Sequence, residues 1–260
     1  MRRPRPIHVS LVVSAAVVSS ALAFSPAAMA SGSTAAVTCD GKTATIVGTD
    51  KRDVIYGTPG DDVIVGLKGF DVLHGAGGND TICGGPGGDH LYGGTGDDWL
   101  DGETDGLIFD EDQVGDHVDG GPGNDTMSGG YGLYGGDRGL DTLVYAHDVA
   151  PLTVDMPKHT ASFDGQTDTI DNFEYVVGTD FADSLTGNQY FNDFTGLGGN
   201  DVLVGNGGID FLEGDDGNDV IKGGGGDDGI SGDAGNDRGN GGDGDDYCFT
   251  FETLVACEHS

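Results

Sequence analysis

The chain has 260 residues, of which 51 are Gly, and its formal net charge is −34 at pH 7. A charge of this sign and size excludes electrostatic binding to nucleic acid or to an anionic membrane surface. So much Gly with few aromatic residues is typical of a disordered chain, unless an internal repeat organises it.

The first thirty residues are predicted to be a secretory signal peptide. Arg2, Arg3 and Arg5 precede the apolar run VSLVVSAAVVSSALAF, and Ala28 and Ala30 form an A-x-A cleavage pattern. A membrane anchor is the alternative, but a span needs about 20 apolar residues and this run is short and rich in Ser and Ala. We therefore expect a secreted, extracellular protein without stable membrane insertion. Cleavage would remove three Arg and no acidic residue, and the formal charge would become −37.

A nonapeptide repeat follows an expected N-terminal cap, residues 31–47. The first repeat block spans residues 48–136 and is degenerate at 102–119, and the second block spans 178–249. Residues 137–177 form a non-repeat connector that is predicted to be rich in β-strands. In the sixteen nonapeptides counted from Gly48 and Gly178, position six is Asp in fifteen and position eight is bulky and apolar in fourteen. Disorder does not keep two chemistries in register over so many units.

The period predicts an all-β fold. Position eight, flanked by positions seven and nine, forms a short strand with one side chain turned inward, and the six residues before it form a turn. Two nonapeptides make one coil of eighteen residues, with two parallel strands facing each other across a thin core. A core of this size is weak and needs additional stabilisation.

The aspartates at position six are predicted to bind calcium. They recur every eighteen residues along each edge, in strands about 4.8 Å apart, where bare carboxylates repel each other. Ca²⁺ takes 6–8 oxygen ligands from carboxylates and carbonyls, whereas Mg²⁺ demands a tighter octahedron. Ten Asp pairs eighteen apart, Asp98 with Asp116 among them, predict about ten ions. The candidate ligands are Asp53, Asp62, Asp71, Asp80, Asp89, Asp98, Asp116, Asp125, Asp183, Asp201, Asp210, Asp219, Asp228, Asp237 and Asp246.

Two positions stand apart within this set. Asn192 replaces the Asp at position six, and with Asp210 it offers a weaker eleventh site. Asp125 has no Asp eighteen residues before or after it, so the count of pairs leaves it without a partner.

The segments GGPGNDTMS and GAGGNDTIC resemble the RTX nonapeptide GGxGxDxUx of hemolysin-type calcium-binding repeats. The resemblance implies a right-handed parallel β-roll with Ca²⁺ in the turns. Residues 141–179 are similar to a connector between RTX blocks, and CDGKTATIVGT is similar to an N-terminal cap. The expected N-terminal leader differs from the C-terminal export signal typical of Gram-negative members. The first repeat also starts too early for a toxin, protease or lipase domain to precede it.

Four cysteines allow three disulfide pairings. We favour Cys39 with Cys83 and Cys248 with Cys257, since each pair then stays at one end of the mature chain. Cys248 and Cys257 are nine residues apart, so both can point inward across the last coil. Their disulfide would close a C-terminal cap, residues 250–260.

Catalytic motifs are missing from the sequence. It contains no H-E-x-x-H, no G-x-S-x-G and no Gly-rich run that ends in G-K-[ST], so we expect no enzyme and no catalytic residues. Two alternatives stay open. One is a hydrolase with a site in residues 103–118 or 141–177, which convergent His and carboxylate groups in a closed pocket would favour. The other is an adhesion or surface protein stiffened by calcium. No protein partner is indicated.

Overall fold

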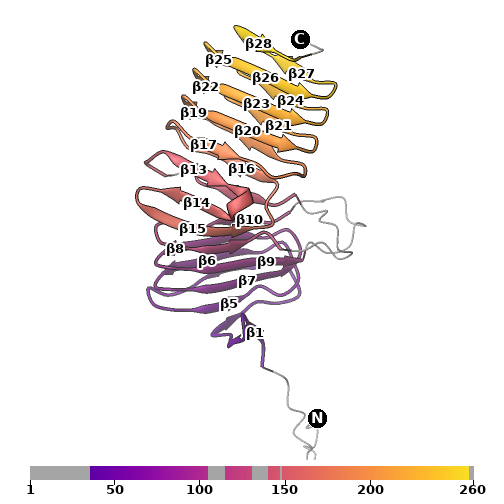
Figure 1. The fold of residues 1–260 in the computed structure, drawn as a ribbon. Coiled ribbons are helices and arrows are strands. Elements are labelled where there is room, and N and C mark those ends of the chain that lie inside the picture. Colours follow the sequence, from indigo (N-terminus) through magenta and orange to yellow (C-terminus); the bar gives the residue numbers. More distant parts are fainter. Residues whose placement is uncertain (1–35, 105–114, 131–139, 147, 258–260) are drawn as a thin grey trace, which may run out of the picture. The chain divides into compact units, whose positions relative to one another are not determined.

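A computed structural model describes residues 36–104, 115–130, 140–146 and 148–257. Its strands form two long sheets, and within each block the chain alternates between them, as Figure 1 shows. The expected leader, 1–30, and most of the irregular stretch 103–114 lie outside the described residues, as do the last residues of the C-terminal cap.

The first sheet has ten strands, and consecutive neighbours are parallel wherever a register is defined. In spatial order these are β4 (Val54–Tyr56), β6 (Val72–Gly77), β8 (His90–Thr95), β10 (His117–Asp119), β12 (Thr142–Val144), β16 (Tyr175–Val177), β18 (Asp193–Thr195), β21 (Phe211–Glu213), β24 (Gly229–Ser231) and β27 (Tyr247–Phe249).

The second sheet has thirteen strands and is parallel except at its middle, where β13, β14 and β15 pair antiparallel. In spatial order these are β3 (Ile46–Val47), β5 (Val63–Val65), β7 (Thr81–Pro86), β9 (Trp99–Thr104), β11 (Thr126–Ser128), β15 (Gln166–Asp171), β14 (Thr160–Phe163), β13 (Leu152–Asp155), β17 (Ser184–Thr186), β20 (Val202–Gly207), β23 (Val220–Gly225), β26 (Arg238–Asp243) and β28 (Thr253–Val255).

Strand pairing confirms that the coil has eighteen residues. Leu73 lies opposite Leu91 in the first sheet, and Leu203 lies opposite Ile221 in the second. In the second block the turns also stack into a third small sheet, made of β19 (Gly198–Gly199), β22 (Asp216–Gly217) and β25 (Ala234–Gly235). The predicted parallel β-roll is therefore correct.

In the two repeat blocks, the core between the sheets consists of the position-eight side chains of both sheets. Those that are at most 1 % exposed are Ile64, Leu73, Ile82, Leu91, Leu100, Val118, Met127, Leu185, Phe194, Leu203, Leu212, Ile221 and Ile230. Gly239 has no side chain to offer at this position, and the ring of Phe251 lies against its Cα instead. Cys248, the other departure from the pattern, is also buried.

One nonapeptide of the first block is left out of the stack. Val118 lies opposite Leu91, and Met127 opposite Leu100, so both offsets are 27 residues instead of 18. The unit that begins at Gly102 has Leu107 where position six calls for Asp. The step of 27 residues thus coincides with a unit that lacks the carboxylate.

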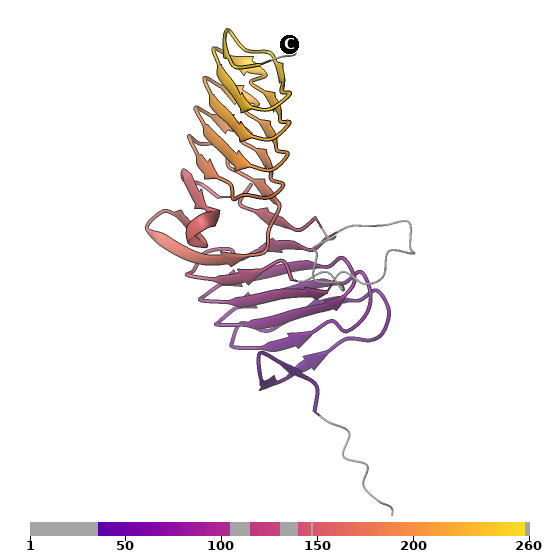
Figure 2. The same ribbon diagram turned by 45° about the vertical axis from the view of Figure 1, so that its right-hand side comes forward.

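The connector forms part of the stack, between the two repeat blocks. Its strands β12 and β16 continue the first sheet, and β15 continues the second, so the strands of the two blocks are joined through it (Figures 1 and 2). The predicted strands at Leu152–Met156 and Phe173–Val177 are present as β13 and β16, with a short 3₁₀ helix, η1 (Met156–Lys158), after β13. The connector thus supplies coils of its own to the stack.

Both disulfides form the predicted pairs. Cys39 and Cys83 are joined with their Cα atoms 5.8 Å apart, and Cys248 and Cys257 with theirs 6.1 Å apart. The first bond ties the antiparallel hairpin of β1 (Thr38–Cys39) and β2 (Lys42–Thr43) to β7. Among the described residues, the chain has no helix long and apolar enough to span a membrane.

Truncation of one core side chain should destabilise the roll. Leu203 is fully buried on β20, whereas its neighbour Val202 is 40 % exposed on the outer face. We expect Leu203→Ala to lower the free energy of unfolding by about 2–5 kcal/mol, and Val202→Ala to change it by at most about 1 kcal/mol. Urea unfolding with calcium present measures both variants. Equal changes in the free energy of unfolding would contradict a core built from the position-eight side chains.

Candidate calcium sites

The position-six aspartates form two ladders of hydrogen bonds, one beside each sheet. In each rung a carboxylate Oδ1 accepts the backbone N–H of the residue one coil earlier. Asp71 Oδ1 accepts from Asp53 N at 2.7 Å, and Asp80 Oδ1 accepts from Asp62 N at 2.8 Å. In the second block, Asp219 Oδ1 accepts from Asp201 N at 2.8 Å. The carboxylates that the sequence singled out therefore stack coil on coil.

The first ladder follows the first sheet, and the second ladder follows the second sheet. The first has two runs, Asp53, Asp71, Asp89, Asp116, Asp141 and Glu174, then Asn192, Asp210, Asp228 and Asp246. The second also has two runs, Asp62, Asp80, Asp98, Asp125 and Asp168, then Asp183, Asp201, Asp219, Asp237 and Glu252. Between the runs of the second ladder, Asp183 Oδ1 accepts from Leu152 N.

The predicted pairing of Asp98 with Asp116 is wrong. Asp116 Oδ1 accepts from Asp89 N at 2.6 Å, and Asp125 Oδ1 accepts from Asp98 N at 2.8 Å. The two residues lie on different ladders because the register steps by 27 residues here, as in the pairing of Val118 with Leu91. Asp125 was also wrongly predicted to lack a partner, since it stands between Asp98 and Asp168 in the second ladder.

Four ladder members are not predicted by the nonapeptide pattern. Asp141, Asp168, Glu174 and Glu252 take the place of position six in coils that do not keep the repeat. For Asp141 and Asp168, the local sequence does match the repeat. Asp141 opens the segment DTLV and Asp168 opens DTID, which match DTIC and DTMS at positions six to nine of the repeat. The two glutamates carry no comparable local pattern.

The second carboxylate oxygen of many ladder members is buried without a hydrogen-bond donor. Among the described residues this holds for Oδ2 of Asp71, Asp80, Asp98, Asp125, Asp201, Asp210, Asp219, Asp228 and Asp237. Each such oxygen lies beside the first Gly of its own nonapeptide. A methyl group on Gly196 would be 2.5 Å from Asp201 Oδ2 and 2.8 Å from the carbonyl oxygen of Gly214, one coil on. A carboxylate oxygen and a carbonyl oxygen therefore both border the space that this methyl group would fill.

The family can now be assigned. A model described as the RTX calcium-binding nonapeptide repeat matches residues 43–73, 56–91, 84–105, 115–132, 177–212, 204–239 and 213–248, together more than half of the chain. The chain belongs to this RTX family. The RTX matches stop at residue 105 and resume at 115, on either side of the unit left out of the stack. A search of curated proteins found no match.

The turns of the RTX coils fit a hard cation. Their free oxygens are carboxylates and carbonyls, the ligands that Ca²⁺ prefers. No group of three or more His, Cys, Asp or Glu side chains suited to a metal occurs in the described part of the chain, so backbone oxygens must complete any site. The turn exposes them through a left-handed residue at position two, as at Leu67 and Asn206, with φ of 77° and 79°. A zinc site built from imidazole or thiolate does not fit here.

Burial disfavours the ionised form of these carboxylates when no counter-ion is present. It raises the pKa of Asp201 to about 7, and the charges of Asp183 and Asp219 add to the rise, while the N–H of Asp183 offsets part of it. Burial likewise raises the pKa of Asp125 to about 7 and of Asp98 to about 6. A proton or a cation is needed to stabilise each of them inside the roll.

The position-five side chains form a separate, solvent-exposed ladder that runs the opposite way. Asn79 N donates to Asp61 Oδ1 at 2.8 Å, and Asp245 N donates to Asp227 Oδ1 at 3.0 Å. Here the later residue donates to the earlier side chain. These acceptors are satisfied from the next coil and lie in water, so they are structural links between turns and matched controls for the buried position.

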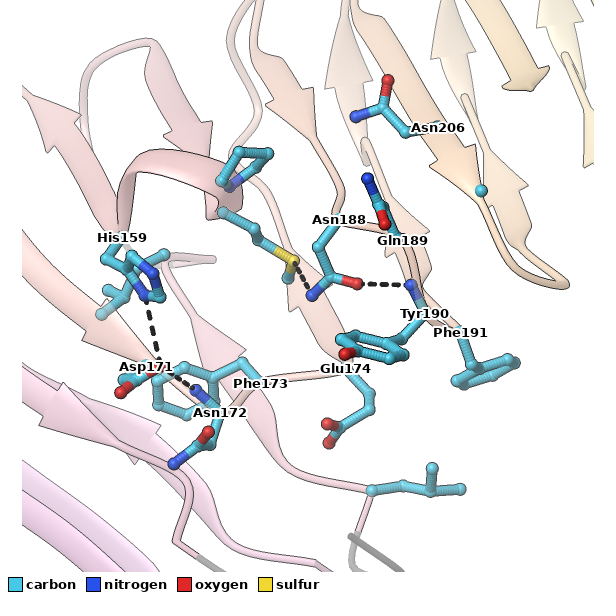
Figure 3. A pocket seen from close by; sticks show the side chains of 15 residues that line it. His159, Asp171, Asn172, Phe173, Glu174, Asn188, Gln189, Tyr190, Phe191 and Asn206 are labelled. Atoms are coloured by element: carbon cyan, nitrogen blue, oxygen red, sulfur yellow. Dashed lines mark hydrogen bonds and ion pairs between the residues drawn. The ribbon is translucent and has the colours of Figure 1, made fainter. Parts of the chain in front are cut away.

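A pocket of about 1340 Å³ lies beside the connector (Figure 3). His159 Nδ1 is 3.2 Å from Asp171 Oδ1, and Glu174 also lines the pocket. Both partners of the pair are more than half exposed, so this is not the closed pocket that the hydrolase alternative requires. The described residues that line it include no Ser, Thr or Cys that could act as a nucleophile. The irregular stretch 105–114 lies outside the described residues.

Adjacent aspartates allow a matched test of the buried position. We expect Asp228→Asn to remove at least ~1 bound calcium ion, because the neutral amide loses the charged oxygen that an ion needs. Asp227→Asn makes the same chemical change at the exposed position five and should leave the stoichiometry unchanged. Isothermal titration with CaCl₂ measures both. Equal losses would show that charge, and not the buried position, controls binding.

The decalcified protein should gain stability in acid. Folded-state pKa values of about 6 to 7 for Asp98, Asp125 and Asp201 lie above the ordinary value of 3.8. Their contribution to folding is complete below pH 3.8 and is lost as the pH rises through 6 to 7. Far-UV circular dichroism in urea, between pH 7.5 and 4, should show rising stability without calcium. The calcium-loaded protein should show the reverse, since protons displace the ion.

Proposed function

We propose that this protein is a secreted calcium-binding RTX β-roll that folds when it binds several Ca²⁺ ions through the Asp-bearing turns. The observation that carries the proposal is the set of buried carboxylate oxygens that have no donor, several of which border the same Gly as a backbone carbonyl oxygen of the next coil. Acceptors placed against acceptors repel each other, and a divalent cation between them reverses the sign of the interaction. The proposed ligands are drawn from the fifteen position-six aspartates and Asp141 of the connector, and those whose Oδ2 has no donor are the foremost candidates.

Charge and calcium supply together make the folding conditional. With a formal charge of −34, the chain repels itself when it becomes compact. Extracellular calcium modules bind at about 10⁻⁴–10⁻³ M, so the ion is scarce inside a cell and sufficient outside it. Since the ion binds the folded state only, binding free energy becomes folding free energy. The chain would stay loose during export and fold on arrival.

Export is part of the proposal and rests on the N-terminal sequence. Residues 1–30 would be removed as a signal peptide, and the mature protein would begin at Ser31. An oxidising compartment fits the two disulfides. No catalytic domain is included in this proposal, because the roll occupies the chain from β3 to β28 in the described residues.

Calcium titration tests the proposal directly. In chelator the spectrum should be largely that of a disordered chain, and millimolar Ca²⁺ should convert it to a β spectrum, with about ten ions bound per chain. Equal concentrations of Mg²⁺ should produce little change, because Mg²⁺ retains its water and demands an octahedron. An unchanged spectrum with calcium would defeat the proposal. N-terminal sequencing of exported protein tests the cleavage site separately.

A further inference from the structure

The RTX turns of this protein are of two kinds. In most described nonapeptides, position two is left-handed, but Thr49, Thr58, Thr179 and Asn188 are not. These four residues belong to the first coil of each block. Thr is β-branched and is strained at positive φ, which accounts for the different turn at the three threonines. We call the turns at these four positions self-capped turns.

In a self-capped turn the chain itself supplies the donor for the position-six side chain. Thr58 N and Oγ1 donate to Asp62 Oδ2 at 2.6 and 2.8 Å. Thr179 N donates to Asp183 Oδ2 at 2.6 Å, and its Oγ1 donates to Asp183 Oδ1 at 2.9 Å. These carboxylates are satisfied without an ion, unlike the donor-less Oδ2 atoms of the left-handed turns.

Asn192 goes further, because its amide nitrogen lies beside Gly187 where the regular coils have a carboxylate Oδ2. Its Nδ2 donates to Tyr190 O at 2.7 Å, Asp210 Oδ1 at 2.9 Å and Gly205 O at 3.4 Å. Three oxygens from two coils therefore surround one amide nitrogen. In the regular coils a carboxylate oxygen and a carbonyl oxygen border the same Gly, as Asp201 Oδ2 and Gly214 O do at Gly196. At Asn192 the same contact is a hydrogen bond.

In the connector, a tyrosine hydroxyl and a backbone N–H donate to ladder carboxylates. The buried Tyr145 hydroxyl donates to Asp168 Oδ2 at 2.6 Å, and Leu152 N donates to Asp183 Oδ1 at 2.7 Å. The Tyr145 ring packs edge-on against Phe163, with centroids 5.3 Å apart. The antiparallel strands β13, β14 and β15 are also neighbours in sequence, so they pair at little entropic cost.

We propose that residues 142–195, which we name the central segment, fold without calcium and serve as the template on which the coils at both sides assemble as calcium binds. Asn192 removes the need for an ion at the junction with the second block, and Tyr145 and Thr179 do the same at Asp168 and Asp183. This inference rests on the proposed function and assigns the ions to the left-handed turns outside the central segment.

Hydrogen exchange of the full-length decalcified protein tests the template. Amides of β13 to β18 should exchange at least about tenfold more slowly than those of β20 to β26 in chelator. Calcium should then protect the outer coils. If the central segment exchanges as fast as the outer coils in chelator while calcium protects both, the template is wrong and the calcium proposal stands. If calcium protects nothing, the calcium proposal itself fails.

Substitution of Asn192 tests the ion replacement. Asn192→Asp puts a carboxylate oxygen among Tyr190 O, Gly205 O and Asp210 Oδ1, so we expect ~1 additional bound Ca²⁺ by isothermal titration. In chelator the same variant should lose the slow exchange of β18. Asn200→Asp, at the exposed position five, is the matched control and should change neither measurement. An unchanged stoichiometry for Asn192→Asp would overturn the assignment.

Discussion

The interaction on which the roll depends is an unfavourable one, between buried carboxylate oxygens without donors and backbone carbonyl oxygens of the neighbouring coil. In several coils the two border the same Gly, as Asp201 Oδ2 and the carbonyl oxygen of Gly214 do at Gly196. The thin core cannot offset such repulsion by itself, because each nonapeptide contributes one buried apolar side chain, such as Leu203 or Ile221. The fold therefore places its need for a positive charge at the turns, where Gly allows the coils to approach closely.

Much of this architecture was predictable from the repeat. A period of nine, with Asp at six and an apolar residue at eight, is enough to predict the coil, the inward side chains and the line of carboxylates. The disulfide pairs followed from keeping each pair at one end of the chain. These features depend on local pattern and on the two-sided geometry of a strand, which the sequence shows directly.

The register across the first block was not predictable in the same way. Counting assumes that every nonapeptide stacks, and the pairing of Val118 with Leu91 shows that one does not. The connector was hidden for a related reason. Asp141 and Asp168 reach the ladders through spacings of 25 and 43 residues, which no nine-residue period reveals. Asn192 looked like a weakened ligand, because only the positions of its three acceptors show that its amide donates.

The direction of the ladders gives the stack two chemically unlike ends. Every rung joins an N–H of one coil to a carboxylate of the next, so the first coil is left with a carboxylate to satisfy and the last with an N–H. At the start, Thr45 Oγ1 donates to Asp62 Oδ1 at 3.2 Å. At the finish, Glu252 Oε2 accepts from Asp237 N at 2.6 Å. A donor therefore closes one end of the stack and an acceptor closes the other. Neither capping group can replace the other, so the two ends are chemically distinct.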